Sequence, residues 1–169
     1  MILELIEAGE FTAYPDALRF VLAVRDAGIR LAAASSSKNA GLMLGRIRID
    51  TFAAEQALDY DFVGPDLSLE DLFDVDISGR DFAHGKPNPE IFVTASGKLD
   101  LLPRECFVVE DAVAGIEAAK AGGMAALGLA RADDAELLSA AAADLVVTTL
   151  DEVDLERLMN GRLASGSRA

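Results

Sequence analysis

The sequence predicts an α/β fold built on a parallel, doubly wound β-sheet. Short apolar runs alternate with helical patterns along the chain, and this alternation is typical of βαβ units. The run 106–109 has no polar alternation, which predicts a strand buried on both faces. A helical pattern follows it directly, and the pair Gly122 and Gly123 ends that helix. With 169 residues, the chain is long enough for one domain with a sizeable core.

The first half of the chain begins with a helix at Pro15, because proline suits the first helical position, and Gly28 ends it. An apolar run, a serine-rich loop and a second helix follow. Gly64 and Pro65 mark a turn, and Ser68 is a typical cap for a short helical turn. We therefore expect helices over 15–27, 39–49, 52–58 and 68–72, and strands over 29–34 and 73–78.

The second half shows the same alternation more clearly. A loop over 79–87 leads to a helix that begins at Pro89 and buries Ile91, Phe92, Ala95 and Leu99. Beyond the strand over 106–110 and its helix, we expect strands over 124–129 and 145–148 and helices over 133–143 and 151–159. Residues 1–160 are predicted to form one domain, and residues 161–169 a flexible tail.

Composition excludes several classes of protein. A net charge of −14 argues against a general nucleic-acid binder, which needs a basic face. No apolar run approaches the roughly 20 residues of a membrane span. The single cysteine, Cys106, excludes an intramolecular disulfide. Residues 1–5 lack the basic start of a secretory signal, so we expect a cytoplasmic protein.

Polar clusters stand where three elements meet loops, and each has two interpretations. The serine loop that begins at Ser35 is either an anion cradle or a helix N-cap. Lys86, held between a glycine and a proline, is either a point charge for a phosphate or solvated surface. Glu110 and Asp111, at a predicted strand end, either hold a hard cation such as Mg²⁺ or cap the next helix.

Taken together, the three clusters resemble the haloacid dehalogenase superfamily, and within it the β-phosphoglucomutase-like branch of sugar-phosphate mutases and phosphatases. The matching stretches are LAAASSSKN at 31–39, HGKPNPEIF at 84–92, and the run 109–124, which begins VEDAVAGIEAAKAGG. The resemblance extends over about 14–154. It implies the Rossmann-like core of that superfamily and a phosphorylated sugar as ligand.

The resemblance also implies a role for each residue. Ser35 would hold the transferring phosphoryl group, and Lys86 would neutralise charge on the phosphate and the nucleophile. Glu110 and Asp111 would belong to a Mg²⁺ site, with Asp111 as the more direct ligand. The phosphate-binding loop would comprise Ser36, Ser37, Lys38 and Asn39, the last three facing the second phosphate of a bisphosphate. Fixed cations and donors of this kind stabilise the charge of a phosphoryl-transfer transition state. A dehalogenase is a further option within the superfamily. The pair Glu110 and Asp111 argues against it, because a metal-dependent site suits a phosphate better than a carbon–halogen bond.

One part of the family pattern is missing. The family places its nucleophile on an earlier strand, in an apolar-D-x-D-G pattern, and none of the 34 residues before Ser35 match it. The helical cap is also absent. The strings at 59–61 and 74–76 contain two aspartates each, but they lack the right context. The sequence thus resembles the carboxyl-terminal part of such an enzyme: a truncated product, a mis-called start or one fragment of two.

The missing nucleophile leads to an expectation about activity and to one about the sheet. The chain is expected to be inactive by itself as a phosphoryl-transfer enzyme; the alternative is a degenerate domain that serves as an interaction module. The strands over 29–34 and 106–110 must then pair directly or accept a strand from a second chain or copy, because unpaired buried backbone groups are costly.

Overall fold

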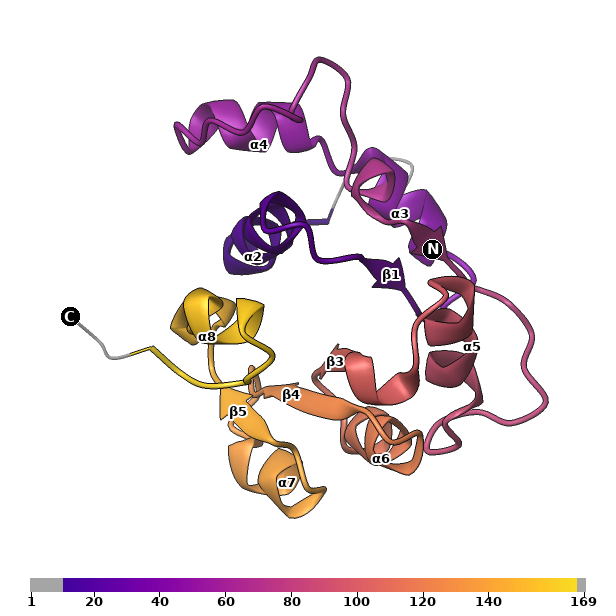
Figure 1. Cartoon of the computed structure of the whole chain (residues 1–169). Coiled ribbons are helices and arrows are strands. Elements are labelled where there is room, and N and C mark those ends of the chain that lie inside the picture. The colour runs from indigo at the N-terminus through magenta and orange to yellow at the C-terminus, as the bar shows by residue number, and fades with distance from the viewer. Residues whose placement is uncertain (1–10, 167–169) are drawn as a thin grey trace. The chain divides into compact units, whose positions relative to one another are not determined.

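The computed structural model describes residues 11–166. Outside that range lie residues 1–5, which were expected not to form a secretory signal, and residues 167–169 of the predicted tail. Two compact units make up the chain, Met1–Arg80 and Asp81–Ala169. Each unit contains a parallel β-sheet accompanied by helices (Figure 1), which confirms the predicted α/β class.

The first unit has a two-stranded parallel sheet. Ala32 of β1 lies opposite Val75 of β2, and both strands are shorter than predicted. The preceding helix begins at Pro15 as expected and buries Leu18 and Leu22. The elements in chain order are α2 (Pro15–Asp26), β1 (Ala32–Ala33), α3 (Ala40–Arg46), α4 (Ile49–Glu55), η1 (Glu70–Leu72) and β2 (Val75–Asp76).

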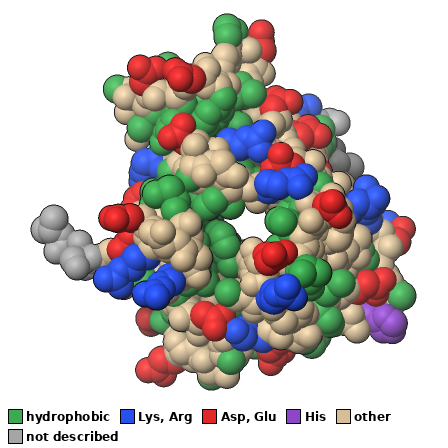
Figure 2. Space-filling view, viewed as in Figure 1, with side chains coloured by type: hydrophobic (Ala, Val, Ile, Leu, Met, Phe, Trp, Pro, Cys, Tyr) green, Lys and Arg blue, Asp and Glu red, His purple; other side chains and the backbone are tan. Residues whose placement is uncertain are grey.

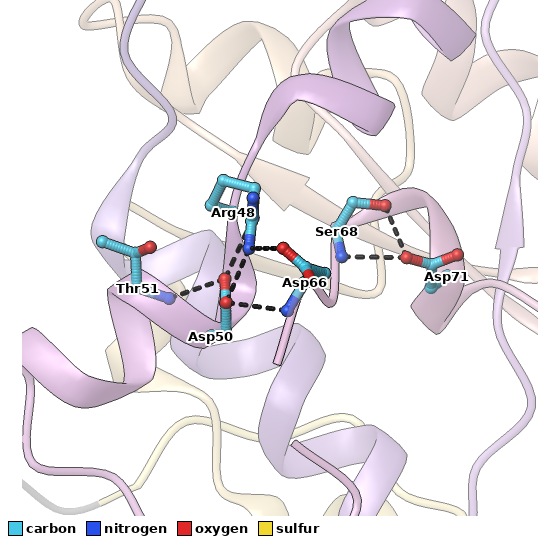
Figure 3. Close-up of polar contacts among 6 residues, drawn as sticks. All are labelled: Arg48, Asp50, Thr51, Asp66, Ser68 and Asp71. Carbon is cyan, nitrogen blue, oxygen red and sulfur yellow. Dashed lines mark hydrogen bonds and ion pairs between the residues drawn. The ribbon is translucent and has the colours of Figure 1, made fainter. Parts of the chain in front are cut away.

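The connection between α3 and β2 is closed by a polar network, shown in Figure 3. The guanidinium of Arg48 donates to Asp50 at 2.7 Å and to Asp66 at 2.9 Å. The N–H of Asp66 donates in turn to Asp50 at 2.9 Å. This pairing with Arg48 is the main reason that the pKa of Asp50 is lowered to about 2. These bonds hold the two ends of the segment 48–66 together.

Two details of this connection differ from the predictions. The helix expected over 52–58 begins earlier and ends earlier, as α4. Ser68 does not cap the following turn: its N–H and hydroxyl donate to the Asp71 carboxylate at 2.9 and 2.7 Å. The carboxylate is the stronger acceptor, so the serine acts as a donor here.

The second unit has a three-stranded parallel sheet with the order β3-β4-β5. Val108 of β3 lies opposite Ala126 of β4, and Leu127 of β4 lies opposite Leu145 of β5. The elements are α5 (Glu90–Lys98), η2 (Pro103–Glu105), β3 (Phe107–Glu110), α6 (Val113–Ala121), β4 (Ala125–Leu129), α7 (Ala135–Ala140), β5 (Leu145–Val147), η3 (Leu150–Glu152) and α8 (Leu155–Met159). The predicted buried face of α5 is confirmed.

The strands of this sheet differ in burial. The central strand is β4, in which Ala126 and Leu127 are fully buried. By contrast β3 lies at the sheet edge, and its Val109 is 38% exposed. The prediction of a strand buried on both faces is therefore wrong for β3. Within residues 11–166, β1 pairs with β2, and β3 pairs with β4.

Part of the predicted tail is hydrogen-bonded. Ser165 forms an antiparallel bridge with Val153, and the N–H of Gly166 donates to the carbonyl of Glu152 at 2.8 Å. These contacts hold the segment after α8 against the turn before it. None of the helices within residues 11–166 is long and apolar enough to cross a membrane.

Candidate functional site

The serine loop begins directly after β1. The Ser35 hydroxyl accepts the N–H of Ser37 at 3.1 Å, and the Ser37 hydroxyl accepts the N–H of Asn39 at 3.3 Å. Each bond joins a serine to the N–H two residues ahead, which is a serine turn. Asn39, not a serine, occupies the N-cap position of α3, and its side chain makes no capping bond. Because both hydroxyls act as acceptors in these bonds, their O–H groups remain donors for a ligand.

The end of β2 supports the serine loop, and sequence reasoning missed this contact. The Ser78 hydroxyl accepts the N–H of Ser35 at 3.3 Å, and the N–H of Gly79 donates to the Ser35 carbonyl at 2.9 Å. Gly79 has a φ of +68°, and a Cβ there would lie 3.0 Å from the Lys38 Cα. Only glycine combines that conformation with that approach. The pair Ser78 and Gly79, at the end of the strand predicted over 73–78, is the signal that could have indicated this support.

The loop that carries Lys86 is tied to the first turn of α5. Glu90 accepts the N–H groups of Ala83 at 3.3 Å and His84 at 3.0 Å. The His84 bond is the main reason that the pKa of Glu90 lies below its usual range. Asn88 adds a bond from its N–H to the Gly85 carbonyl at 3.0 Å. Hydrogen bonds within residues 83–90 therefore hold the loop in a defined conformation.

Lys86 points to the carboxyl end of β3. Its Nζ forms an ion pair with Oε1 of Glu110, and the two side chains are only 20% and 10% exposed. The ammonium also lies over the ring of Phe92, 4.8 Å from the ring centroid. The interpretation of Lys86 as solvated surface is thus not what the structure shows.

Glu110 occupies the gap between β3 and α6. Its Oε2 accepts the N–H of Asp111 at 3.2 Å and the N–H of Ala112 at 3.3 Å. A Cβ at Gly115 would overlap this carboxylate. Gly115 therefore provides the space for Glu110, and the negative charge lies next to the start of α6, where the helix dipole favours it.

The end of β3 carries two neighbouring carboxylates, Glu110 and Asp111. Asp111 is exposed next to Glu110. Within residues 11–166 no group of three or more His, Cys, Asp or Glu side chains could hold a metal ion. Mg²⁺ in proteins is usually held by one or two carboxylates together with waters and substrate phosphates. The pair therefore fits Mg²⁺ in donor type, with the remaining ligands coming from outside this pair.

The predicted site residues fall into two groups. Lys86, Glu110 and Asp111 gather at one end of β3 in the second unit. The loop from Ser35 to Asn39, including Ser36, Ser37 and Lys38, belongs to the first unit. One of the two aspartate strings, 74–76, binds backbone groups: the Asp74 carboxylate accepts the N–H of Leu31, and the Asp76 carboxylate accepts the N–H of Ser78.

Comparison with known proteins identifies relatives of the chain. Residues 2–123 match the model of the haloacid dehalogenase-like hydrolase family. A β-phosphoglucomutase of Bacillus subtilis (strain 168) is 34% identical over 140 residues, which are 83% of this chain and 51% of that protein. A validoxylamine A 7′-phosphate phosphatase of Streptomyces hygroscopicus subsp. limoneus is 45% identical over 82 residues, 48% of this chain and 38% of that protein.

Solved structures agree with these sequence relatives. An archaeal β-phosphoglucomutase from Pyrococcus sp. strain ST 04 superposes with a TM-score of 0.69 at 31% sequence identity. The match covers 95% of this chain and 62% of the Pyrococcus chain. The chain thus spans about half the length of its Bacillus relative and less than two thirds of the Pyrococcus structure.

Proposed function

Because this chain belongs to the haloacid dehalogenase-like hydrolase family, we propose that it provides part of the site of a Mg²⁺-dependent enzyme that transfers a phosphoryl group to or from a sugar. The two sequence relatives are named as a β-phosphoglucomutase and a validoxylamine A 7′-phosphate phosphatase, and both names denote phosphoryl chemistry, which supports this class of reaction. The observation that carries the proposal is the Lys86–Glu110 ion pair beside the exposed Asp111 at the end of β3.

Each residue has a defined task in this proposal. The ammonium of Lys86 attracts phosphate oxygens, and the hydroxyl of Ser35 donates a hydrogen bond to the phosphoryl group. Asp111 and Glu110 hold Mg²⁺, which supplies positive charge to a phosphate ligand when bound. Ser36 belongs to the same phosphate-binding loop, and Ser37, Lys38 and Asn39 bind a second phosphate when the ligand is a bisphosphate. These positions leave mutase and phosphatase as equal alternatives.

Calorimetric titration with Mg²⁺ and inorganic phosphate tests the proposal. We expect K86A to weaken phosphate binding at least about tenfold, because it removes a charge-assisted contact. The matched control is K98A, which removes an exposed lysine from the last turn of α5. We expect D111N to weaken Mg²⁺ binding. Equal phosphate affinity in K86A, K98A and the unchanged protein would contradict the proposal.

We further propose that residues 1–169 alone do not turn over a sugar phosphate, because the sequence contains no apolar-D-x-D-G pattern for a nucleophile. Steady Mg²⁺-dependent phosphate release from a hexose phosphate by the purified chain would refute this. Loss of that release in K86A is required as well, since it separates the chain's own activity from a contaminating phosphatase.

A second candidate function is a non-catalytic interaction module, and the edge position of β3 favours it. An edge strand presents unpaired backbone groups to another chain, and Val109 of β3 is exposed beside them. The proposed partner is a strand of apolar-D-x-D-G pattern from a second chain. A peptide of that pattern should shift the amide resonances of Phe107–Glu110, whereas its scrambled version should not. Binding of the peptide without any binding of phosphate or Mg²⁺ would favour the module over the enzyme.

A further inference from the structure

The ring of Phe92 lies beneath the Lys86 ammonium. The distance from Nζ to the ring centroid is 4.8 Å, inside the roughly 6 Å limit of a favourable cation–π contact. Phe92 is 5% exposed and the Lys86 side chain 20% exposed. Such contacts are stronger where water is excluded, so this pair is in a favourable setting.

The backbone around Lys86 makes this arrangement specific. Glu90, two residues before Phe92 on α5, accepts the N–H groups of Ala83 and His84 at 3.3 and 3.0 Å. Its own N–H donates to the side chain of Asn88 at 3.0 Å. These bonds join the lysine loop to the helical turn that presents the ring. The ring therefore holds its place relative to the loop.

An aromatic ring supports an ammonium differently from a carboxylate. An ammonium has three N–H donors, and the ion pair with Glu110 uses one of them. A second carboxylate beside Lys86 would use another donor and cancel more of the positive charge. The face of a ring attracts the cation and leaves its formal charge unchanged, so the remaining donors can serve an anion.

From this geometry we infer that Phe92 is a positioning residue for Lys86: its ring holds the ammonium at the end of β3 in a state ready to bind an anionic ligand. The consequence for phosphate binding rests on the function proposed above, whereas the contact between ring and ammonium does not. The two parts can therefore be tested separately.

The first test is spectroscopic and uses the unchanged chain. We expect nuclear Overhauser contacts between the Lys86 Cε protons and the Phe92 ring protons, and an upfield ring-current shift of those Cε protons. F92L nearly conserves volume but has no ring, so it should abolish the shift. Absence of both signals in the unchanged chain would overturn the inference, whatever the phosphate data show.

The second test compares phosphate affinity in matched variants. We expect F92L to weaken inorganic phosphate binding about 3- to 10-fold. The control is I91V, which trims a neighbouring side chain that is equally buried on α5. An equal loss in F92L and I91V would assign the effect to packing and overturn the positioning role. If K86A itself leaves phosphate binding unchanged, the proposed function fails, while the ring contact is still decided by the spectra.

Discussion

Replacing Gly115 by alanine should displace the Glu110 carboxylate, because the new Cβ would overlap it. Glu110 then loses its ion pair with Lys86 and its bonds to the N–H groups of Asp111 and Ala112, at 3.2 and 3.3 Å. Breaking a buried ion pair costs about 3–5 kcal/mol. Partial rehydration of the displaced carboxylate and a gain of about 1 kcal/mol from alanine in a helix reduce that figure.

We therefore expect G115A to lower the free energy of unfolding by about 2 kcal/mol, measured by urea denaturation. G97A is the matched control: Gly97 lies in α5 with no atom within 4 Å of its Cβ position, so alanine should stabilise it by about 0.5–1 kcal/mol.

The decisive measurement repeats G115A in an E110A background. Without the Glu110 carboxylate there is no overlap, and the substitution should now stabilise the helix by about 0.5–1 kcal/mol. A reversal of sign is the expected result. If G115A destabilises the chain by the same amount in both backgrounds, the contact with Glu110 is not the reason that glycine is needed here.

Two further predictions concern the first unit. The pKa of Asp50 is about 2 in the folded chain and about 3.9 in an unfolded one, so its stabilising effect is complete above about pH 4 and is lost as the pH falls towards 2. The urea midpoint of the unchanged chain should therefore exceed that of D50N at pH 6, and the gap should close between pH 4 and 2; a gap independent of pH would contradict this. G79A should cost about 1–3 kcal/mol, more than G28A, because both glycines have positive φ but only at Gly79 does a Cβ lie 3.0 Å from the Lys38 Cα. Equal urea denaturation losses in the two variants would show that the contact with Lys38 has no energetic weight.

The sequence by itself determined the α/β class and the approximate place of most elements in residues 11–166. Proline at position 15, glycine at position 122 and the apolar periodicities are local signals, and local signals mark where helices and strands begin and end. The same local stretches left two interpretations for Lys86 and for the pair Glu110 and Asp111, and the resemblance to the haloacid dehalogenase superfamily selected the ligand-binding one. The structure places these three residues together at one end of β3.

Only the tertiary structure decided which strand is central and how the site residues are held. An apolar run looks alike in a central and an edge strand, so the edge position of β3 was not visible in its sequence. Ser78 supports Ser35 from 43 residues away, and Lys86 meets Glu110 across 24 residues. Contacts at such separations depend on strand order and on the path of the loops, which no local pattern encodes. Likewise, only the structure shows that a Cβ at position 115 would overlap the Glu110 carboxylate.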